Sequence, residues 1–484
     1  MEDTTTRNPA SETSGPPARR PRILFIKSRA NDPTWKQLSH PLGVMYLAAY
    51  LRSKFGYEIK IVDTRLTKID RDGLTAVIRE FAPDIVGISA LTFESKAIEW
   101  IAACAKQVNP QVPVLLGGPH ATAYCDKAIE TPNIDYLVLG EGELTAGRLI
   151  ESLLANRDVS EIKGLVFKRG GETIKTGRAE FIEDLNQLPL PAYDLIPIKP
   201  YRNFERFSRS GSGVYMGVFS SRGCPYRCIY CHNIFGKAFR AKSAETFFAE
   251  IKYLHDTYQI REFEIFDDIF NLDRERLLKF CDLIIQSGMR VSFAFPNGVR
   301  GDLLDEEQLR KLQAAGTIYI SFAIESGSPR IQKLIHKNLK LDVVRRNIEI
   351  AHSLRIHTHG FFMIGFPGET REEIQMTMDL LFSSRLHSFN IFAVMPFEGT
   401  ELGNMVREMG REPVSDFSLS YLTEKFVNLT AVSDEEINRV RRQALVKFFI
   451  DPARIFYLVR DTPDKRMLYK LPYLFFRRLH WRSL

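Results

Sequence analysis

Short apolar runs alternate with amphipathic segments through most of the chain. Between residues 22 and 155, five runs rich in Ile, Val and Leu are each followed by a stretch with helical spacing. Strands buried on both faces of a parallel sheet are continuously apolar, and the intervening helices cover that sheet. The pattern predicts a flavodoxin-like or Rossmann-like α/β domain with strands at 22–27, 58–63, 84–89, 113–118 and 135–140.

A second alternation of the same kind begins near Val214. It contains six strand–helix units in about 190 residues, which is too few for a closed eight-stranded barrel and favours a partial (β/α)₆ barrel. The expected strands are 214–221, 262–267, 290–296, 317–325, 358–365 and 388–396.

The remaining segments suggest how these two domains are joined and bounded. Residues 164–169 and 172–177 flank Gly170-Gly171 and predict a hairpin, and the proline-rich stretch 185–200 predicts an extended linker. The polar start of the chain is expected to be disordered and the basic end to be helical. The expected divisions are a tail at 1–20, the first domain at 21–156, the hairpin and linker at 157–205, the barrel at 206–430 and a helical region at 431–484.

Composition narrows the class of protein only moderately. The 484 residues are 44% hydrophobic and 26% charged with a net charge of +7, which is ordinary for a globular protein and does not indicate nucleic-acid binding. The first 22 residues lack the apolar centre of a secretory signal, and no apolar run is long enough to cross a membrane. We therefore expect a cytoplasmic protein whose six cysteines are not a disulfide framework.

Three of these cysteines lie within eight residues, directly after the first strand of the second domain. Cys224, Cys228 and Cys231 have the spacing C-x3-C-x2-C. Thiolates are the usual protein ligands of iron–sulfur clusters, and three of them leave one iron of a cubane open for another molecule. The alternative is a zinc site, for which His232 is the only close fourth ligand, at a spacing that common zinc modules do not use.

This loop resembles the signature of the radical S-adenosylmethionine superfamily, with Tyr230 at the aromatic position before the last cysteine. The resemblance implies a 4Fe–4S cluster on the three cysteines, whose open iron binds S-adenosylmethionine and whose electron generates a 5′-deoxyadenosyl radical. It also implies an electron donor such as a flavodoxin or ferredoxin.

Further segments resemble the superfamily at the carboxyl ends of later strands, where such barrels place their active sites. The resemblance assigns Asp267 and Asp268 to the methionine amino group, Arg300 to its carboxylate, Glu325 and Ser326 to the ribose, and Ile364 and Phe366 to the adenine. Residues 396–400 match another common segment. Individually these positions also fit ordinary roles, namely a helix cap at Thr370, a turn at 365–368 and a solvated carboxylate at Asp267.

The first domain carries small residues where its strands end, which lets a large ligand approach the backbone. With Pro41-Leu42-Gly43, these segments resemble the cobalamin-binding domain fused to many radical S-adenosylmethionine enzymes, over residues 22–155. The cobalamin-binding residues it implies are Ser89, Thr92, Gly117, Gly118, Gly140, Glu141 and Gly142.

One feature of cobalamin domains is missing. The loop at 28–33 has no D-x-H-x-x-G motif, and we expect His40 and His120 to be ordinary loop histidines. Cobalamin can bind without a protein imidazole, although a domain that has lost cobalamin remains an alternative.

These features together predict a cobalamin-dependent enzyme that methylates an unactivated carbon of a small-molecule or lipid-like substrate. Two alternatives remain: a radical cyclase or rearrangement enzyme of the anaerobic tetrapyrrole cyclase type, and a non-catalytic cobalamin sensor. A methylthiotransferase is disfavoured because a second three-cysteine set is missing. The basic, aromatic C-terminal segment is either a helical cap on the barrel or a peripheral membrane contact.

Overall fold

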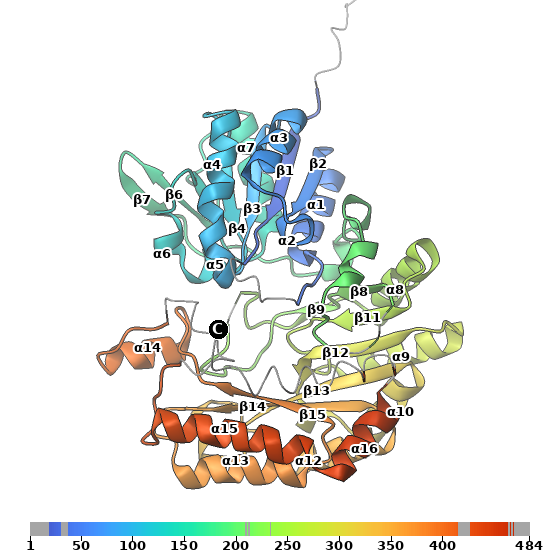
Figure 1. Cartoon of the computed structure of the whole chain (residues 1–484). Helices are drawn as coiled ribbons and strands as arrows, with labels where there is room; N and C mark the ends of the chain where they lie inside the picture. Colours follow the sequence, from blue (N-terminus) through green and yellow to red (C-terminus); the bar gives the residue numbers. More distant parts are fainter. Residues whose placement is uncertain are drawn as a thin grey trace, which may run out of the picture.

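The computed structural model describes residues 19–30, 37–208, 211, 213–232, 234–414, 426–462, 465 and 468. Two sheet domains follow one another along the chain, and the loops that leave the carboxyl ends of their strands meet at the junction (Figure 1). Most of the predicted N-terminal tail, residues 31–33 of the predicted loop and most of the chain after residue 462 lie outside the described residues.

The first domain is a seven-stranded sheet in the order β2-β1-β3-β4-β5-β6-β7, of which β1 to β5 are parallel. The order 2-1-3-4-5 is that of flavodoxin-like folds, as the sequence predicts. Its elements are β1 (Arg22–Lys27), α1 (Leu42–Phe55), β2 (Glu58–Asp63), α2 (Thr64–Thr67), α3 (Arg71–Phe81), β3 (Ile85–Ser89), η1 (Thr92–Ala97), α4 (Ile98–Val108), β4 (Val114–Gly117), α5 (Pro119–Ala123), α6 (Cys125–Ala128), β5 (Tyr136–Val138), α7 (Gly142–Leu154), β6 (Leu165–Arg169) and β7 (Glu172–Lys175).

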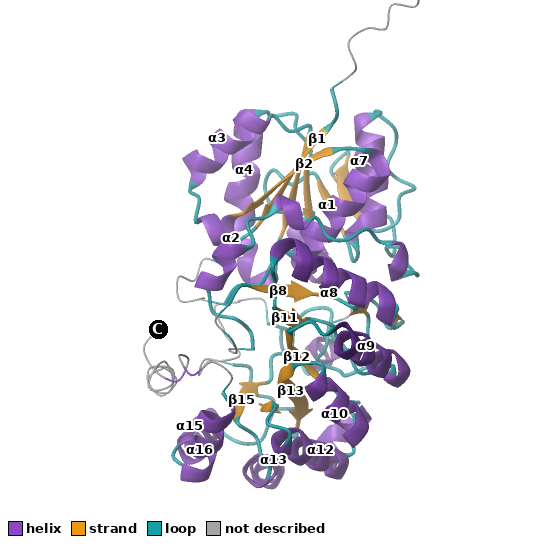
Figure 2. Cartoon of the chain, turned by 90° about the vertical axis from the view of Figure 1, so that its right-hand side faces the viewer, coloured by secondary structure: helices purple, strands orange, loops and turns teal. Residues whose placement is uncertain are grey.

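Helices cover both faces of this sheet, which explains why its strands are apolar throughout (Figure 2). On one face α3 and α4 pack over a core that includes Leu24, Val86 and Leu116. On the other face α1 and α7 enclose a core that includes Ile23 and Leu115.

The hairpin β6–β7 belongs to this sheet and not to the linker, so the predicted division at residue 157 is wrong. Strand β6 pairs antiparallel with β5, and Leu165 and Val166 are fully buried. The predicted extended linker is also wrong in part, because residues 185–203 form three short 3₁₀ turns, η2 (Leu185–Gln187), η3 (Tyr193–Leu195) and η4 (Lys199–Asn203). Tyr193 and Tyr201 in these turns are buried and donate hydrogen bonds to Glu250 and Asp63.

The second domain is a six-stranded parallel sheet in the order β15-β14-β13-β12-β11-β8, which is the predicted partial barrel. A two-stranded ribbon, β9–β10, follows its first strand. Its elements are β8 (Tyr215–Val218), β9 (Ser221–Arg222), β10 (Arg240–Ala241), α8 (Ala244–Tyr258), β11 (Glu262–Ile265), α9 (Arg274–Ser287), β12 (Ser292–Val299), η5 (Gly301–Leu303), α10 (Glu306–Ala314), β13 (Thr317–Glu325), α11 (Pro329–Leu334), α12 (Leu341–Ser353), β14 (His357–Ile364), α13 (Arg371–Ser383), β15 (Ser388–Ala393), α14 (Glu401–Glu408), α15 (Asp434–Phe449) and α16 (Pro452–Asp461).

The last two helices confirm that the described part of the C-terminal region is helical. Helix α15 covers the edge strand β15, where Phe448 and Phe389 have ring centroids 4.7 Å apart. Arg454 of α16 donates hydrogen bonds to the carbonyl oxygens of Ser384 and Leu386, 3.1 Å away in each case. The inner faces of both helices therefore cap the barrel.

Candidate functional site at the junction of the two domains

The cysteine loop is closed at its base by Gly223 and the ribbon β9–β10. Gly223 has φ +81°, and a Cβ there would lie 2.3 Å from the Ala238 carbonyl oxygen and 3.0 Å from that of Phe235. Only glycine fits so close to two backbone segments. The two ends of the loop consequently pack against each other, which places Cys224 at the carboxyl end of β8.

The three cysteines line one cavity of about 220 Å³. They are not joined in disulfides. Partial burial, with Asp268 nearby, raises the pKa of Cys224, so the thiolate that binds a metal needs compensating positive charge. Within the described ranges no three Cys, His, Asp or Glu side chains converge on a position for a single metal ion. Three thiolates on one loop are the usual protein ligands of a cubane cluster that leaves one iron open.

His232, the candidate fourth zinc ligand, is half exposed, and its Nε2 lies 3.7 Å from Oδ1 of Asp268. Asp268 itself lines the cavity, and its burial, with the adjacent Asp267, raises its pKa. The imidazole therefore faces a carboxylate at the rim of the cavity.

A buried ion pair forms one wall of the cavity. Lys337 Nζ lies 2.7 Å from Glu325 Oε1, and both side chains are less than 10% exposed. Glu325 ends β13 with φ +68°, a conformation that is strained for a residue other than glycine. Tyr230 lies beside the pair, 3.4 Å from Lys337 Nζ, and burial raises its pKa well above the usual value. The strained backbone and the lysine together fix the direction of the Glu325 carboxylate.

Arg300 forms another wall and contacts the cysteine loop directly. Its guanidinium lies 3.8 Å from the centre of the Tyr226 ring. It also lies 3.0 Å from Oδ1 of Asp302 and donates a hydrogen bond of 2.7 Å to the Lys337 carbonyl oxygen. Cationic and anionic groups therefore lie on the same cavity, which suits a zwitterionic ligand such as the methionine part of S-adenosylmethionine.

Several residues expected in the site lie behind it. Asp267 is buried outside the cavity lining and accepts hydrogen bonds from the backbone and side chain of Ser220 and from Ser221, so it supports the start of the cysteine loop. Ser326 is fully buried, with its Oγ 3.3 Å from Oγ1 of Thr377.

The two residues expected beside the adenine are also fully buried, and neither lines the cavity. Ile364 belongs to the main core of the barrel. Phe366 packs with Ile229 in a small cluster under the loop. Thr370 caps α13, which is the ordinary role that its position permits.

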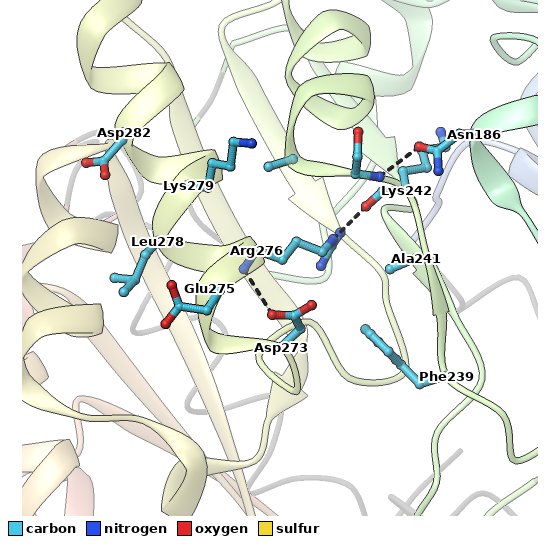
Figure 3. Close-up of a pocket in the computed structure, with 12 residues that line it drawn as sticks. Asn186, Phe239, Ala241, Lys242, Asp273, Glu275, Arg276, Leu278, Lys279 and Asp282 are labelled. Carbon is cyan, nitrogen blue, oxygen red and sulfur yellow. Dashed lines mark hydrogen bonds between the residues drawn. The ribbon is translucent and has the colours of Figure 1, made fainter.

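A larger cavity of about 770 Å³ lies outside the barrel, near the first turns of α8 and α9 (Figure 3). It contains none of the cysteines or predicted cofactor residues, so its size does not make it the site. One of its residues supports the site from behind. Arg276 donates hydrogen bonds to the carbonyl oxygens of Lys242, at 2.7 Å, and Ser220, at 3.1 Å, next to the cysteine loop.

The facing edge of the first sheet includes several small, partly exposed residues. Lys27, Ser89, Gly117 and Val138 occupy one register row across the carboxyl ends of β1, β3, β4 and β5. Ser89 and Gly117 are partly exposed, as are Thr92, Gly118 and Gly140 just beyond the strands. Lys27 and Val138 are buried, so the small residues are the ones that a ligand would meet. A planar ligand can approach the backbone there, so this part of the edge fits the expected corrin ligand.

Glu141 and Gly142 also follow the carboxyl end of β5, but neither belongs to the row of small residues at the sheet edge. Gly142 begins α7, and a Cβ there would lie 3.6 Å from Leu47. Glu141 is buried against the second domain, where it pairs with Arg240 and with Arg222, the latter at 3.1 Å.

This buried network joins the two domains. Arg222 Nη2 lies 2.7 Å from Oε1 of Glu143, and all four side chains are at most 8% exposed. Arg222 directly precedes Gly223 and the first cysteine, and Glu141 lies three residues after the end of β5. The network thus fixes the cysteine loop against the carboxyl edge of the first sheet.

The two histidines that the sequence offered are both buried. Burial lowers the pKa of His40 to about 3 and that of His120 to about 4, so both are neutral at ordinary pH. His40 Nδ1 accepts a hydrogen bond from the Gly217 amide at 3.2 Å. Residues 31–33 of the loop at 28–33, where the D-x-H-x-x-G motif is missing, lie outside the described residues.

Sequence reasoning gave no role to Lys337, Tyr226, Arg222 or Arg240. Tyr226 and Arg222 had a visible signal, since one lies between the first two cysteines and the other two residues before the first. Lys337 had none, because it reaches Glu325 from the segment after α11, far from the cysteine loop in the chain.

Comparison with known proteins agrees with this geometry. The radical SAM superfamily model matches residues 218–381, and the B12 binding domain model matches residues 33–150. An uncharacterised methyltransferase of Pyrococcus horikoshii is 31% identical over 85% of this chain and 88% of its own length. The cytidylyl-2-hydroxyethylphosphonate methyltransferase of Streptomyces wedmorensis is 31% identical over 82% of this chain and 84% of its own.

The same fold occurs in a solved structure of the radical S-adenosylmethionine methyltransferase TsrM from Kitasatospora setae. The TM-score is 0.69 at 19% identity, over 80% of this chain and 76% of that one. The two domain matches, the two relatives and the cavity lined by three cysteines lead to one conclusion. The chain belongs to the cobalamin-binding radical S-adenosylmethionine enzymes, and its cofactors are a 4Fe–4S cluster, S-adenosylmethionine and cobalamin.

Proposed function

We propose that the protein transfers a methyl group to an unactivated carbon of a small molecule. The observation that carries this proposal is the junction itself, where Arg222 and Arg240 fix the cysteine loop against the carboxyl edge of the first sheet. When bound, the cluster, S-adenosylmethionine and cobalamin supply the radical and the methyl group. The chain keeps their two binding regions adjacent, which is what successive attack on one substrate carbon requires.

Within the cavity the residues have separable roles. Cys224, Cys228 and Cys231 provide the three thiolates. Glu325, held by Lys337, offers a carboxylate oriented for two neighbouring hydroxyl groups. Burial of these groups removes water from the place where a reactive carbon would form.

The barrel wall below the cavity supports a substrate with polar groups near the reacting carbon. Side chains alternate along a strand, so Ser321 lies on the same side of β13 as the cavity residue Ala323. Ser321 is fully buried, and its Oγ has no hydrogen-bond partner among the described residues. On β14, His359 Nδ1 lies 2.7 Å from Oγ of Ser388. An aliphatic substrate would leave the Ser321 hydroxyl unsatisfied.

The test is an anaerobic incubation of the reconstituted protein with S-adenosylmethionine, a reductant and cobalamin. We expect both 5′-deoxyadenosine and S-adenosylhomocysteine. Cys228→Ala should abolish 5′-deoxyadenosine, whereas Cys125→Ala, a partly exposed cysteine of the first domain, should not. Continued formation of 5′-deoxyadenosine by Cys228→Ala would overturn the ligand assignment.

A second candidate is radical cyclisation without methyl transfer. The anaerobic magnesium-protoporphyrin IX monomethyl ester cyclase of Rubrivivax gelatinosus is 25% identical over 92% of this chain. Product mass separates the two reactions, because methylation adds a methylene unit and cyclisation does not. Formation of 5′-deoxyadenosine without S-adenosylhomocysteine would favour the cyclase.

A further inference from the structure

The C-terminal helices α15 and α16 carry apolar side chains on the face that does not touch the barrel. Ile450 is 62% exposed and Phe456 is 60% exposed. The outer apolar patch consists of Val446, Ile450, Ile455, Phe456 and Val459, which are all exposed. Val446 and Ile450 are four residues apart on α15, as are Ile455 and Val459 on α16, so each pair lies on one helix face.

This patch is distinct from the packing that holds the helices in place. The opposite side of α15 contributes the fully buried Phe448 and Ile437 to the barrel core. Both helices lie on the outside of the barrel, at the end of the molecule away from the first domain (Figure 1). Capping the barrel therefore explains their inner faces and leaves the outer patch unexplained.

Exposed cations accompany the patch on α15. Arg439 and Arg442 are exposed, and neither forms an ion pair within the described residues. The ammonium of Lys447 is different, because it lies 4.3 Å from the centre of the Phe382 ring on α13. Arg439 and Arg442 lie on the same helix face as Val446 and Ile450, at spacings of three and four residues. Uncompensated charge next to apolar side chains is typical of surfaces that meet anionic interfaces.

The rest of the sequence after Arg439 is also rich in basic and apolar residues. Residues 439–484 contain twelve Lys and Arg against three Asp and Glu, so this segment carries the whole positive excess of a chain whose net charge is +7. Its last stretch, LPYLFFRRLHWRSL, combines aromatic, aliphatic and basic residues. Positive charge is thus concentrated at the end of the chain that bears the patch.

We propose that the outer apolar patch and its cations dock the protein on an anionic lipid surface. The apolar side chains enter the boundary between headgroups and acyl chains, and the cations remain at the headgroups. None of the described helices is long and apolar enough to cross a membrane, so the contact is peripheral. A second copy of the chain is a poorer partner, because its own cations would face these.

The test is flotation of the full-length, cluster-loaded protein with vesicles of phosphatidylcholine, with and without phosphatidylglycerol. We expect binding only to the anionic vesicles. The double variant Ile450→Ser with Phe456→Ser should weaken binding at least about tenfold, since two exposed apolar side chains lose their burial. Arg439→Gln with Arg442→Gln should weaken it roughly fivefold for each cation removed, and added salt should do the same.

The matched control is Ile285→Ser on α9, where an isoleucine is 41% exposed away from the patch. This variant should bind like the unmodified protein. Equal binding by the double patch variant would overturn the proposal. So would a dimer in sedimentation that the patch variant abolishes, because a second copy would then be the partner. Anionic vesicles should slow hydrogen exchange in residues 446–460. If they leave the exchange rates unchanged, the proposal is also overturned.

Discussion

Arg240 and Glu141 form a two-point contact across the junction of the two sheet domains. Arg240 Nη1 lies 3.1 Å from Oε2 of Glu141, and Nη2 contacts Oε1. Both side chains are less than 10% exposed. Neither charge can be left without its partner out of water, so any relative position of the domains that separates the two side chains is strongly disfavoured.

Replacing Arg240 by Gln should therefore destabilise the folded protein by about 3 kcal/mol, because Glu141 keeps only part of its compensation. The measurement is the denaturant dependence of unfolding. The control is Arg148→Gln, which breaks the half-exposed pair with Glu180 and should cost at most about 1 kcal/mol. Combining Arg240→Gln with Glu141→Gln should recover part of the loss. If Arg240→Gln and Arg148→Gln lowered the free energy of unfolding equally, the buried junction pair would contribute no more than an exposed pair.

Lys337 should matter for cofactor binding through Glu325. Lys337→Met removes the 2.7 Å contact that orients the carboxylate, and a charge-assisted hydrogen bond of this kind contributes about 1.5–3 kcal/mol. We expect S-adenosylmethionine to bind the reconstituted protein at least about tenfold more weakly, as measured by equilibrium dialysis.

Lys333→Met is the matched control, because this lysine of α11 is exposed and lines neither cavity. It should leave the affinity unchanged. If Lys337→Met is folded, as shown by circular dichroism, and binds S-adenosylmethionine as tightly as the unmodified protein, then the assignment of Glu325 to the binding site is wrong.

His352, near the end of α12, and His387, just before β15, should make the fold sensitive to acid. Burial lowers the pKa of His352 from 6.5 to about 4 and also lowers that of His387, with which it stacks at 4.7 Å. At a pH between the two pKa values, the imidazole is protonated in the unfolded chain but neutral in the folded protein. Stability should therefore fall as the pH drops from about 6.5 to about 4, by about 1 kcal/mol per pH unit for one such histidine.

Denaturation midpoints across this pH range measure the effect. His352→Gln should flatten the dependence, whereas His336→Gln, at a half-exposed position, should not. A dependence of unchanged slope in His352→Gln would contradict the assignment of the acid effect to this buried imidazole.

The strands were predictable to within a few residues because burial on both faces requires nearly continuous apolar runs. The strand at 317–325 has the predicted bounds, and that at 358–365 is shifted by one residue. The placement of the β6–β7 hairpin was not predictable, because local sequence shows that a hairpin forms but not which edge it joins. The 3₁₀ turns around Tyr193 and Tyr201 depend on partners in other elements, Glu250 and Asp63, and local proline content gave no sign of them.

The candidate site also has features that the local sequence predicts and features that depend on the tertiary structure. Cys224, Cys228 and Cys231 are close in sequence, so their spacing alone determined that three thiols share one loop. The sequence also determined the order of the two domains and the small residues at the edge of the first sheet. Only the tertiary structure decided that Glu141 pairs with Arg240, that Lys337 holds Glu325, and that Asp267 supports the loop from behind. The physical reason is that a charged side chain has no preferred partner along the chain, and its partner is set by the groups that burial brings within hydrogen-bonding distance.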